Sequence, residues 1–213
     1  MSTKMLRALL LALLGAGALP AFAFEGVPDA NAKVTGQSAP NVLTPELVQA
    51  AVAQGAHRLE NPASVLLPSG ATALVTHYGY NGDGPFVPQP GDVQTTTHNV
   101  EASKTEPDKN TYLVLRGQKG ADPGYDYGTH FLFQGHEVGS PGSITRINLD
   151  ADAAHRVTVL AITEKDGVTP LPTIDGSTWY PWSRRLLVSQ EGNGATSGGI
   201  WQATPDFPSV AEN

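Results

Sequence analysis

The amino-acid sequence predicts an all-β protein, and three observations lead to this prediction. Glycine and proline are abundant, with 23 and 17 residues in a chain of 213, whereas charged residues make up only 15%. Short segments rich in β-branched and aromatic residues recur along the chain, each bounded by turn residues. Two of these segments belong to hairpins that resemble each other. These features favour short strands joined by tight turns rather than helices.

The first 23 residues have the features of a secretory signal peptide. Lys4 and Arg7 form a positive n-region, and residues 9–19 form an apolar h-region. Ala21-Phe22-Ala23 matches a cleavage site, which places the cut after Ala23. The apolar run is too short for a membrane span, and an uncleaved anchor is the alternative. Because no twin arginine is present, we expect Sec-type export to the periplasm or the medium, with no membrane contact after cleavage.

Residues 24–60 are expected to form a polar lead-in and one short N-terminal helix. Thr44, Pro45 and Glu46 have the pattern of a helix start, with a hydroxyl N-cap, proline at the first helical position and an acid in the first turn. Gly55 is a natural helix stop. The apolar face of this helix would contain Leu47, Val48, Ala51 and Val52.

From Pro62 onward the pattern is one of strands. Seven segments qualify: 71–78, 111–116, 130–134, 144–148, 156–162, 185–189 and 199–204. Two longer stretches, 79–92 and 117–127, have few strand-forming residues. Loops of this length in a compact domain are often functional or mobile.

An internal repeat predicts the architecture of residues 61–213. The strand that ends at Glu137 is followed by a glycine-rich turn and a returning strand at Ile144, and the same order recurs at Glu191 and Ile200. The two glutamates lie 54 residues apart, and kelch-like propeller blades repeat every ~50 residues. We therefore expect a partial β-propeller of two to three blades, incomplete because propellers have ~4–8 blades. A chance likeness of two hairpins is the alternative.

Charge and composition exclude several functions. Removing Lys4 and Arg7 with the signal leaves 11 Lys+Arg against 20 Asp+Glu, a formal net charge of −9. Such a surface repels nucleic acid and anionic lipid but is compatible with divalent cations. The chain has no cysteine, so it has no disulfide, thiolate zinc site or cysteine nucleophile.

Glu137 and Glu191 are the candidate metal ligands. Both stand where a strand meets a turn, at equivalent places in the repeat. In a propeller such ends can face the central channel, and converging carboxylates suit calcium, which accepts ~6–8 oxygen ligands. The alternative is a pair of solvated turn glutamates. His136 would suit iron, zinc or copper, or would be a hydrogen-bonded structural residue.

At these residues the sequence resembles a known family, the PhoX-type alkaline phosphatases. The strand ending in Gln134-Gly-His-Glu137 is similar to the family's apolar strand that ends in Asn-His-Glu. The stretch from Pro181-Trp182 to Ser189-Gln-Glu191-Gly-Asn193 is similar to its Pro-Trp…Cys-Glu-Glu-Asn segment. The run from His98 to Ala203 looks like the N-terminal part of PhoX-like secreted proteins, and the resemblance covers roughly residues 60–210.

The resemblance implies a six-bladed propeller with calcium and iron in its channel and hydrolysis of phosphate monoesters outside the cytoplasm. It assigns Glu137 and Glu191 as metal ligands. The family's iron-binding cysteine falls at or beside Ser189-Gln190, and this chain has no cysteine there. A hydroxyl or an amide replaces a thiolate poorly on iron. The family's twin-arginine signal and its later blades are absent as well.

Two main functional hypotheses follow, and they differ in class. The first is an exported metal-dependent phosphatase of PhoX-like type acting on a small phosphate ester. The second is a non-catalytic, calcium-stabilised propeller that binds a ligand or partner. The missing cysteine favours the second hypothesis, and the two glutamates fit either one. A truncated fragment without activity of its own is the third possibility.

Overall fold

The short apolar segments fold into antiparallel sheets, and the all-β prediction is confirmed. In the computed structural model, the described residues are 43–48, 50–55, 57–81, 105–137, 141–192 and 198–213. They form eleven strands, and no helix occurs among them. The predicted signal peptide 1–23 and most of the lead-in lie outside the described residues. The described residues from 51 onward cluster as one compact unit.

The first sheet contains three strands in sequential order. They are β1 (Arg58–Leu66), β2 (Thr72–His77) and β3 (Tyr80–Asn81), and both neighbouring pairs are antiparallel. The β1–β2 turn closes with a hydrogen bond from Leu67 N to Ala71 O of 2.8 Å. Gly70 has a φ of +82° in this turn, a conformation that residues with a Cβ rarely adopt.

Two further sheets have four strands each, again in sequential order. The second sheet contains β4 (Pro107–Val114), β5 (His130–His136), β6 (Ser143–Asn148) and β7 (Val157–Ala161). The third sheet contains β8 (Ile174–Tyr180), β9 (Arg185–Gln190), β10 (Gly199–Ala203) and β11 (Ala211–Glu212). All pairs are antiparallel, as expected for strands joined by short turns.

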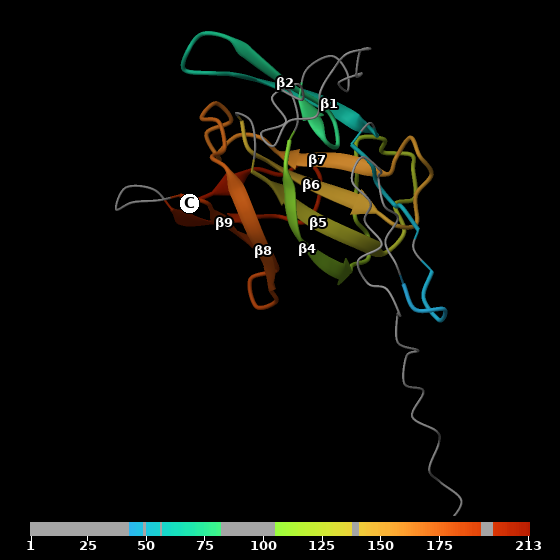
Figure 1. Ribbon diagram of the computed structural model, residues 1–213. Coiled ribbons are helices and arrows are strands. Elements are labelled where there is room, and N and C mark those ends of the chain that lie inside the picture. Colours follow the sequence, from blue (N-terminus) through green and yellow to red (C-terminus); the bar gives the residue numbers. More distant parts are fainter. Residues whose placement is uncertain (1–42, 49, 56, 82–104, 138–140, 193–197) are drawn as a thin grey trace, which may run out of the picture. The chain divides into compact units, whose positions relative to one another are not determined.

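The second sheet lies between the other two, with an apolar core against each face (Figure 1). On one face, Phe131 and Phe133 of β5 pack with Leu186 and Val188 of β9. On the other face, Val157 and Val159 of β7 belong to the core that includes strands β1 and β2. Every residue of β6 and β7 is buried as a result. This double burial makes the second sheet the rigid element that positions the functional side chains.

The helix predicted to begin at Thr44 does not form in the described residues. Residues 43–48 make a single turn, with a hydrogen bond of 3.0 Å from Leu47 N to Thr44 O. Leu47 and Val48, which were expected on the apolar face, are 48% and 92% exposed. A helix of this length gains most of its stability from packing of that face, so the capping residues alone are insufficient. Among the described residues, no helix is long and apolar enough to cross a membrane.

Candidate metal centre

Two aspartates occupy matching places in the second and third sheets. Asp108 is the second residue of β4, and Asp175 is the second residue of β8. In both sheets the strand register is interrupted at this point, between Pro107 and Asn110 and between Ile174 and Ser177. An irregularity of this kind leaves residues outside the regular ladder and redirects their side chains.

Two glutamates also occupy matching places. Glu137 follows the last residue of β5, and its N–H donates to Glu106 O at 2.8 Å. Glu191 follows the last residue of β9, and its N–H donates to Thr173 O at 3.2 Å. Each glutamate therefore stands opposite the residue that precedes the first strand of its own sheet. The two sheets share one local design, in which an aspartate and a glutamate lie near the same end.

The packing of the two sheets brings three of these carboxylates together. Carboxylate oxygens of Asp108, Glu137 and Asp175, which we call the acidic cluster, all lie within 4.8 Å of one another. Strands β4 and β8 approach closely, since Thr111 Oγ1 lies 2.8 Å from Ser177 Oγ. All three residues are half-buried. The cluster thus combines a rigid support with access from solvent.

Gly135 permits this close approach. A Cβ placed on Gly135 would lie 2.5 Å from Ile174 Cγ2 and 2.7 Å from the carbonyl oxygen of Asp175. Contacts this short with backbone atoms force the strands apart, so only glycine fits here. The glycine two residues before Glu137 is therefore what allows β5 to contact β8 at the cluster.

The carboxylates of the acidic cluster repel one another. Burial raises the pKa of Glu137, and the charges of Glu191, Asp108, Asp175 and Glu106 raise it further. The pKa of Asp175 is raised first by a hydrogen bond with Asp108, then by burial and by the charges of Asp108 and Glu191. Lys109 offers partial compensation, with its Nζ 3.9 Å from Asp175 Oδ1, but its side chain is 71% exposed. Within the part of the chain that the structure describes, the negative charges are incompletely neutralised by protein groups.

His136 is a structural residue rather than part of this site. Its Nε2 lies 2.8 Å from Thr145 Oγ1 and its Nδ1 lies 3.2 Å from Thr105 Oγ1, so both ring nitrogens are occupied. The edge of the Tyr78 ring packs against it. Complete burial lowers the pKa of His136 to about 3, which keeps the imidazole neutral. Of the two interpretations open from the sequence, the structural one fits.

The sequence predicted part of the acidic cluster. Glu137 lies in the acidic cluster, and Glu191 is near enough for its charge to raise the pKa of both Glu137 and Asp175. Asp108 and Asp175 were missed. The signal that would have found them is the repeat extended backward, because each aspartate lies in the strand that precedes the strand ending in glutamate.

The donor set fits calcium and does not fit iron. Carboxylates are hard oxygen ligands, and calcium accepts them at flexible geometry. No thiol exists in the chain, and His136 has both nitrogens occupied. Ser189, which stands near the position of the family's cysteine, accepts a hydrogen bond of 3.1 Å from Gly176 N and is held by that backbone. A soft ligand for iron is therefore missing from the described residues around the cluster.

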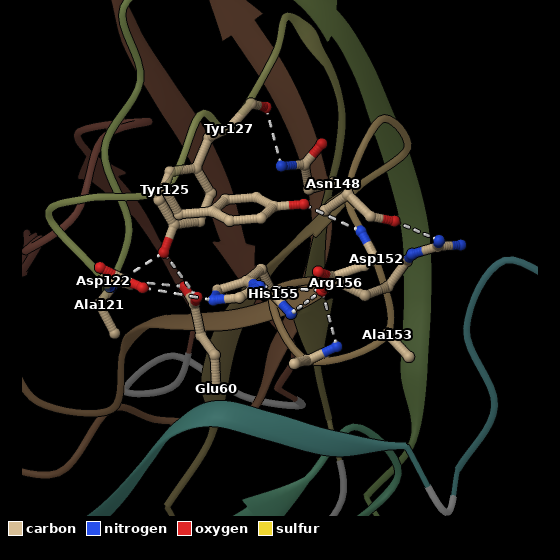
Figure 2. Close-up of polar contacts among 12 residues, drawn as sticks. Glu60, Ala121, Asp122, Tyr125, Tyr127, Asn148, Asp152, Ala153, His155 and Arg156 are labelled. Atoms are coloured by element: carbon tan, nitrogen blue, oxygen red, sulfur yellow. Dashed lines mark hydrogen bonds and ion pairs between the residues drawn. The ribbon is translucent and has the colours of Figure 1, made fainter.

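A second polar constellation contains the side chains of Glu60, Asp122, Tyr125, Tyr127, Asp152 and His155, and we call it the Tyr–His network (Figure 2). The Tyr125 and His155 rings stack with centroids 3.8 Å apart. Asp152 Oδ1 lies 2.8 Å from His155 Nδ1, and Asp122 Oδ2 lies 3.6 Å from its Nε2.

Glu60 and the buried Arg146 both contact Tyr127 of this network. Tyr127 Oη donates to Glu60 Oε2 at 2.7 Å, and Thr158 Oγ1 donates to Glu60 Oε1 at 2.5 Å. The Arg146 guanidinium donates to Lys119 O at 2.7 Å and lies over the Tyr127 ring. Positively charged groups are therefore interspersed with the carboxylates here, unlike in the acidic cluster.

No family model, curated protein or solved structure matches this chain.

Proposed function

We propose that this chain is an exported, calcium-binding β-propeller module whose cation site is the acidic cluster. The observation that carries the proposal is the convergence of carboxylates from matching positions of two sheets, Asp108 and Glu137 from one and Asp175 from the other. Like charges held this close destabilise the fold unless protons or cations neutralise them. Outside the cytoplasm, calcium is the divalent cation that suits an all-oxygen site.

The repetition of the two four-stranded sheets supports the propeller part of the proposal. Each sheet is a simple antiparallel meander, as propeller blades are. The first strands of the two sheets, β4 and β8, contact each other, as inner strands of neighbouring blades do around a channel. The number of six blades comes from the resemblance to PhoX-type phosphatases alone.

Phosphate-monoester hydrolysis is the second candidate, and Lys109 is the observation that favours it. A cation in the cluster would supply a Lewis acid for phosphoryl oxygens. Glu137 and Glu191 would hold it, as the resemblance implies. Lys109 Nζ stands beside Asp175 with a 71% exposed side chain, so it can turn toward a phosphate anion at the same place. The binding module remains the first proposal because a cation would relieve the repulsion in the acidic cluster whether or not a substrate follows.

Calcium titration of the mature protein tests the binding proposal. We expect calcium to raise the melting temperature of the chelated protein. Glu137→Gln removes one repelling charge and one ligand, so we expect this variant to be more stable than the wild type in chelator and insensitive to calcium. Glu164→Gln, a partly buried glutamate outside the cluster, is the matched control and should respond like the wild type. An equal calcium shift in Glu137→Gln and wild type would refute the site.

Phosphate release from p-nitrophenyl phosphate separates the two functions. The assay uses the mature chain with calcium, with calcium and iron, and after chelation. Turnover that chelation abolishes and that Glu191→Gln removes would establish the phosphatase. Calcium binding by a folded sample that releases no phosphate would establish the module without catalysis.

A further inference from the structure

A pocket of about 430 Å³ lies beside the Tyr–His network, away from the acidic cluster. Its walls come from the β4–β5 connection and from the segment between β10 and β11. The volume falls in the range of ~300–1,000 Å³ that is common for small-molecule sites. The apolar part of its lining is aromatic and proline-rich, with Pro123, Tyr125, Tyr127, Phe207 and Pro208.

The walls of this pocket are held in place before any ligand arrives. Tyr127 is 2% exposed, and its hydroxyl accepts a hydrogen bond of 3.0 Å from Asp122 N while it donates to Glu60. Lys119 N donates to Asp206 Oδ1 at 2.6 Å, which ties the two sides of the pocket together. A Cβ on Gly120 would lie 2.0 Å from the Tyr127 ring, so glycine is required at that position. A preformed site loses little conformational entropy on binding.

One polar atom of the lining lacks a partner. Gln118 Oε1 is buried and accepts no hydrogen bond from the described residues, whereas neighbouring polar groups such as Tyr127 Oη and Lys119 N are satisfied within the protein. This oxygen has less than 1 Å² of exposed surface, but the Gln118 side chain as a whole is only partly buried, so a side-chain rotation can present the oxygen to the pocket. A buried acceptor without a donor is unfavourable, so a ligand donor that meets the rotated amide gains affinity. Asp122 adds a second acceptor, since its side chain is 53% exposed.

Charges of both signs surround the pocket, so they favour neither an anion nor a cation. Asp122 and the nearby Glu60 and Asp206 oppose an anion. Arg146, whose guanidinium lies 5.4 Å from the centroid of the Tyr127 ring, occupies the position of a cation over this aromatic wall. Together with Lys119 it opposes a second cation.

We propose that this pocket binds a neutral sugar ring. A pyranose offers several hydroxyl donors for Gln118 Oε1 and Asp122, and an apolar C–H face for the Tyr125, phenylalanine and proline side chains. A simple phenol has the apolar face but a single donor, so it leaves one acceptor unpaired. The proposal is independent of the cation site, because none of the acidic-cluster residues lines the pocket.

Saturation-transfer NMR with the methyl glycosides of glucose, galactose and N-acetylglucosamine tests this proposal on the calcium-treated mature protein. We expect transfer from at least one glycoside, together with shifts of the Tyr125 and Tyr127 ring signals, and none from benzoate or tetramethylammonium. Gln118→Leu should weaken binding by about ten-fold through loss of the acceptor. Gln54→Leu, on an exposed residue outside this pocket, should bind as the wild type does.

The result that overturns the proposal is also defined. Absence of transfer from all three glycosides, or equal affinity in Gln118→Leu and wild type, would exclude a sugar at this pocket. Because Gln118 Oε1 is an unpaired buried acceptor, its replacement by leucine should not lower the melting temperature. If the variant were unstable, the ring shifts of Tyr125 and Tyr127 in the wild type would still decide the outcome.

Discussion

The acidic cluster and the Tyr–His network both gather carboxylates where sheets meet, but only one of them contains its own counter-charges. In the Tyr–His network, Glu60 accepts hydrogen bonds from Tyr127 and Thr158, and His155 lies between Asp152 and Asp122. In the acidic cluster, one exposed lysine lies beside three converging carboxylates. The comparison separates charge that stabilises the folded chain by itself from charge that a bound cation would stabilise.

This difference appears in the direction of the pKa shifts. The pKa of Asp152 is lowered, chiefly by its hydrogen bond to His155, so the charged form is favoured in the network. The pKa of Glu137 is raised by burial and by its acidic neighbours, so the charged form is disfavoured in the cluster. Without a cation, stability contributed at Glu137 is present below its ordinary pKa of 4.5 and is lost as the pH rises through the raised value. Calcium should cancel this loss.

The largest expected effect on stability comes from removing Arg146, which packs against the Tyr–His network. Arg146→Leu removes a fully buried guanidinium that donates to Lys119 O, Pro205 O and Thr158 Oγ1. We expect the free energy of unfolding to fall by about 3–5 kcal/mol, because two carbonyls and the Thr158 hydroxyl lose a donor and Glu60 loses a nearby positive charge. Urea unfolding measures this loss. Arg116→Leu, on an exposed arginine, is the control and should change stability little.

A loss as small as that of Arg116→Leu would contradict the comparison, because it would mean that Arg146 does not hold the network together. The unpaired Nε of Arg146 is already buried without a partner, so the bonds made by the other two nitrogens must outweigh that penalty.

A smaller effect is expected at Gly135, where the acidic cluster is assembled. Gly135→Ala places a methyl group against the β8 backbone, and overpacking of this kind costs about 1–3 kcal/mol. Because the strands must separate, the calcium-induced rise in melting temperature should shrink as well. Thermal unfolding with and without calcium measures both effects. Gly176→Ala is the control, because its nearest atom is the Ser189 side-chain oxygen at 3.3 Å, which can adjust.

Equal losses in Gly135→Ala and Gly176→Ala would show that the close approach of β5 to β8 is not what builds the cluster. Gly135 and Gly176 lie in facing strands near the same carboxylates. Comparing the two variants therefore separates the effect of backbone packing from the effect of a nearby charge.

How much of this fold was predictable depends on how each strand is built. All seven expected segments overlap strands of the structure, because their apolar residues face a core on at least one side. Strand β8 was missed since Asp175, Gly176 and Ser177 interrupt its apolar pattern, and Asp175 belongs to the acidic cluster. Strand β1 was missed because Asn61 and Pro62 break it, near a shift in its register with β2.

The sequence predicted two of the four carboxylates at the site, for a related reason. Glu137 and Glu191 end apolar strands, so the repeat in the sequence marks them. Asp108 and Asp175 lie in irregular pairings, and their meeting depends on the packing of two sheets, which periodicity within one strand does not report. The predicted helix does not form in the described residues either. Capping residues mark where a helix can begin, but burial of its apolar face decides whether it persists.

The smallest expected effect is a pH dependence in the Tyr–His network. The hydrogen bond to Asp152 raises the pKa of His155 above 6.5, and the charges of Asp152, Glu60 and Asp122 act in the same direction. The folded state therefore holds this proton more tightly than the unfolded state. The resulting stability is fully present below pH 6.5 and is lost as the pH rises through the folded pKa.

His155→Gln should flatten this upper step in a series of melting temperatures from pH 5 to pH 9. Calcium is present throughout, so that the proposed cation site is filled in both proteins. His77, whose pKa is lowered by burial, contributes the opposite slope in both proteins, so the difference between the two curves isolates His155. A parallel pair of curves would mean that the network holds His155 by stacking on Tyr125 alone, without a contribution from its charge. The Tyr–His network would then be compensated by hydrogen bonds and not by ion pairs.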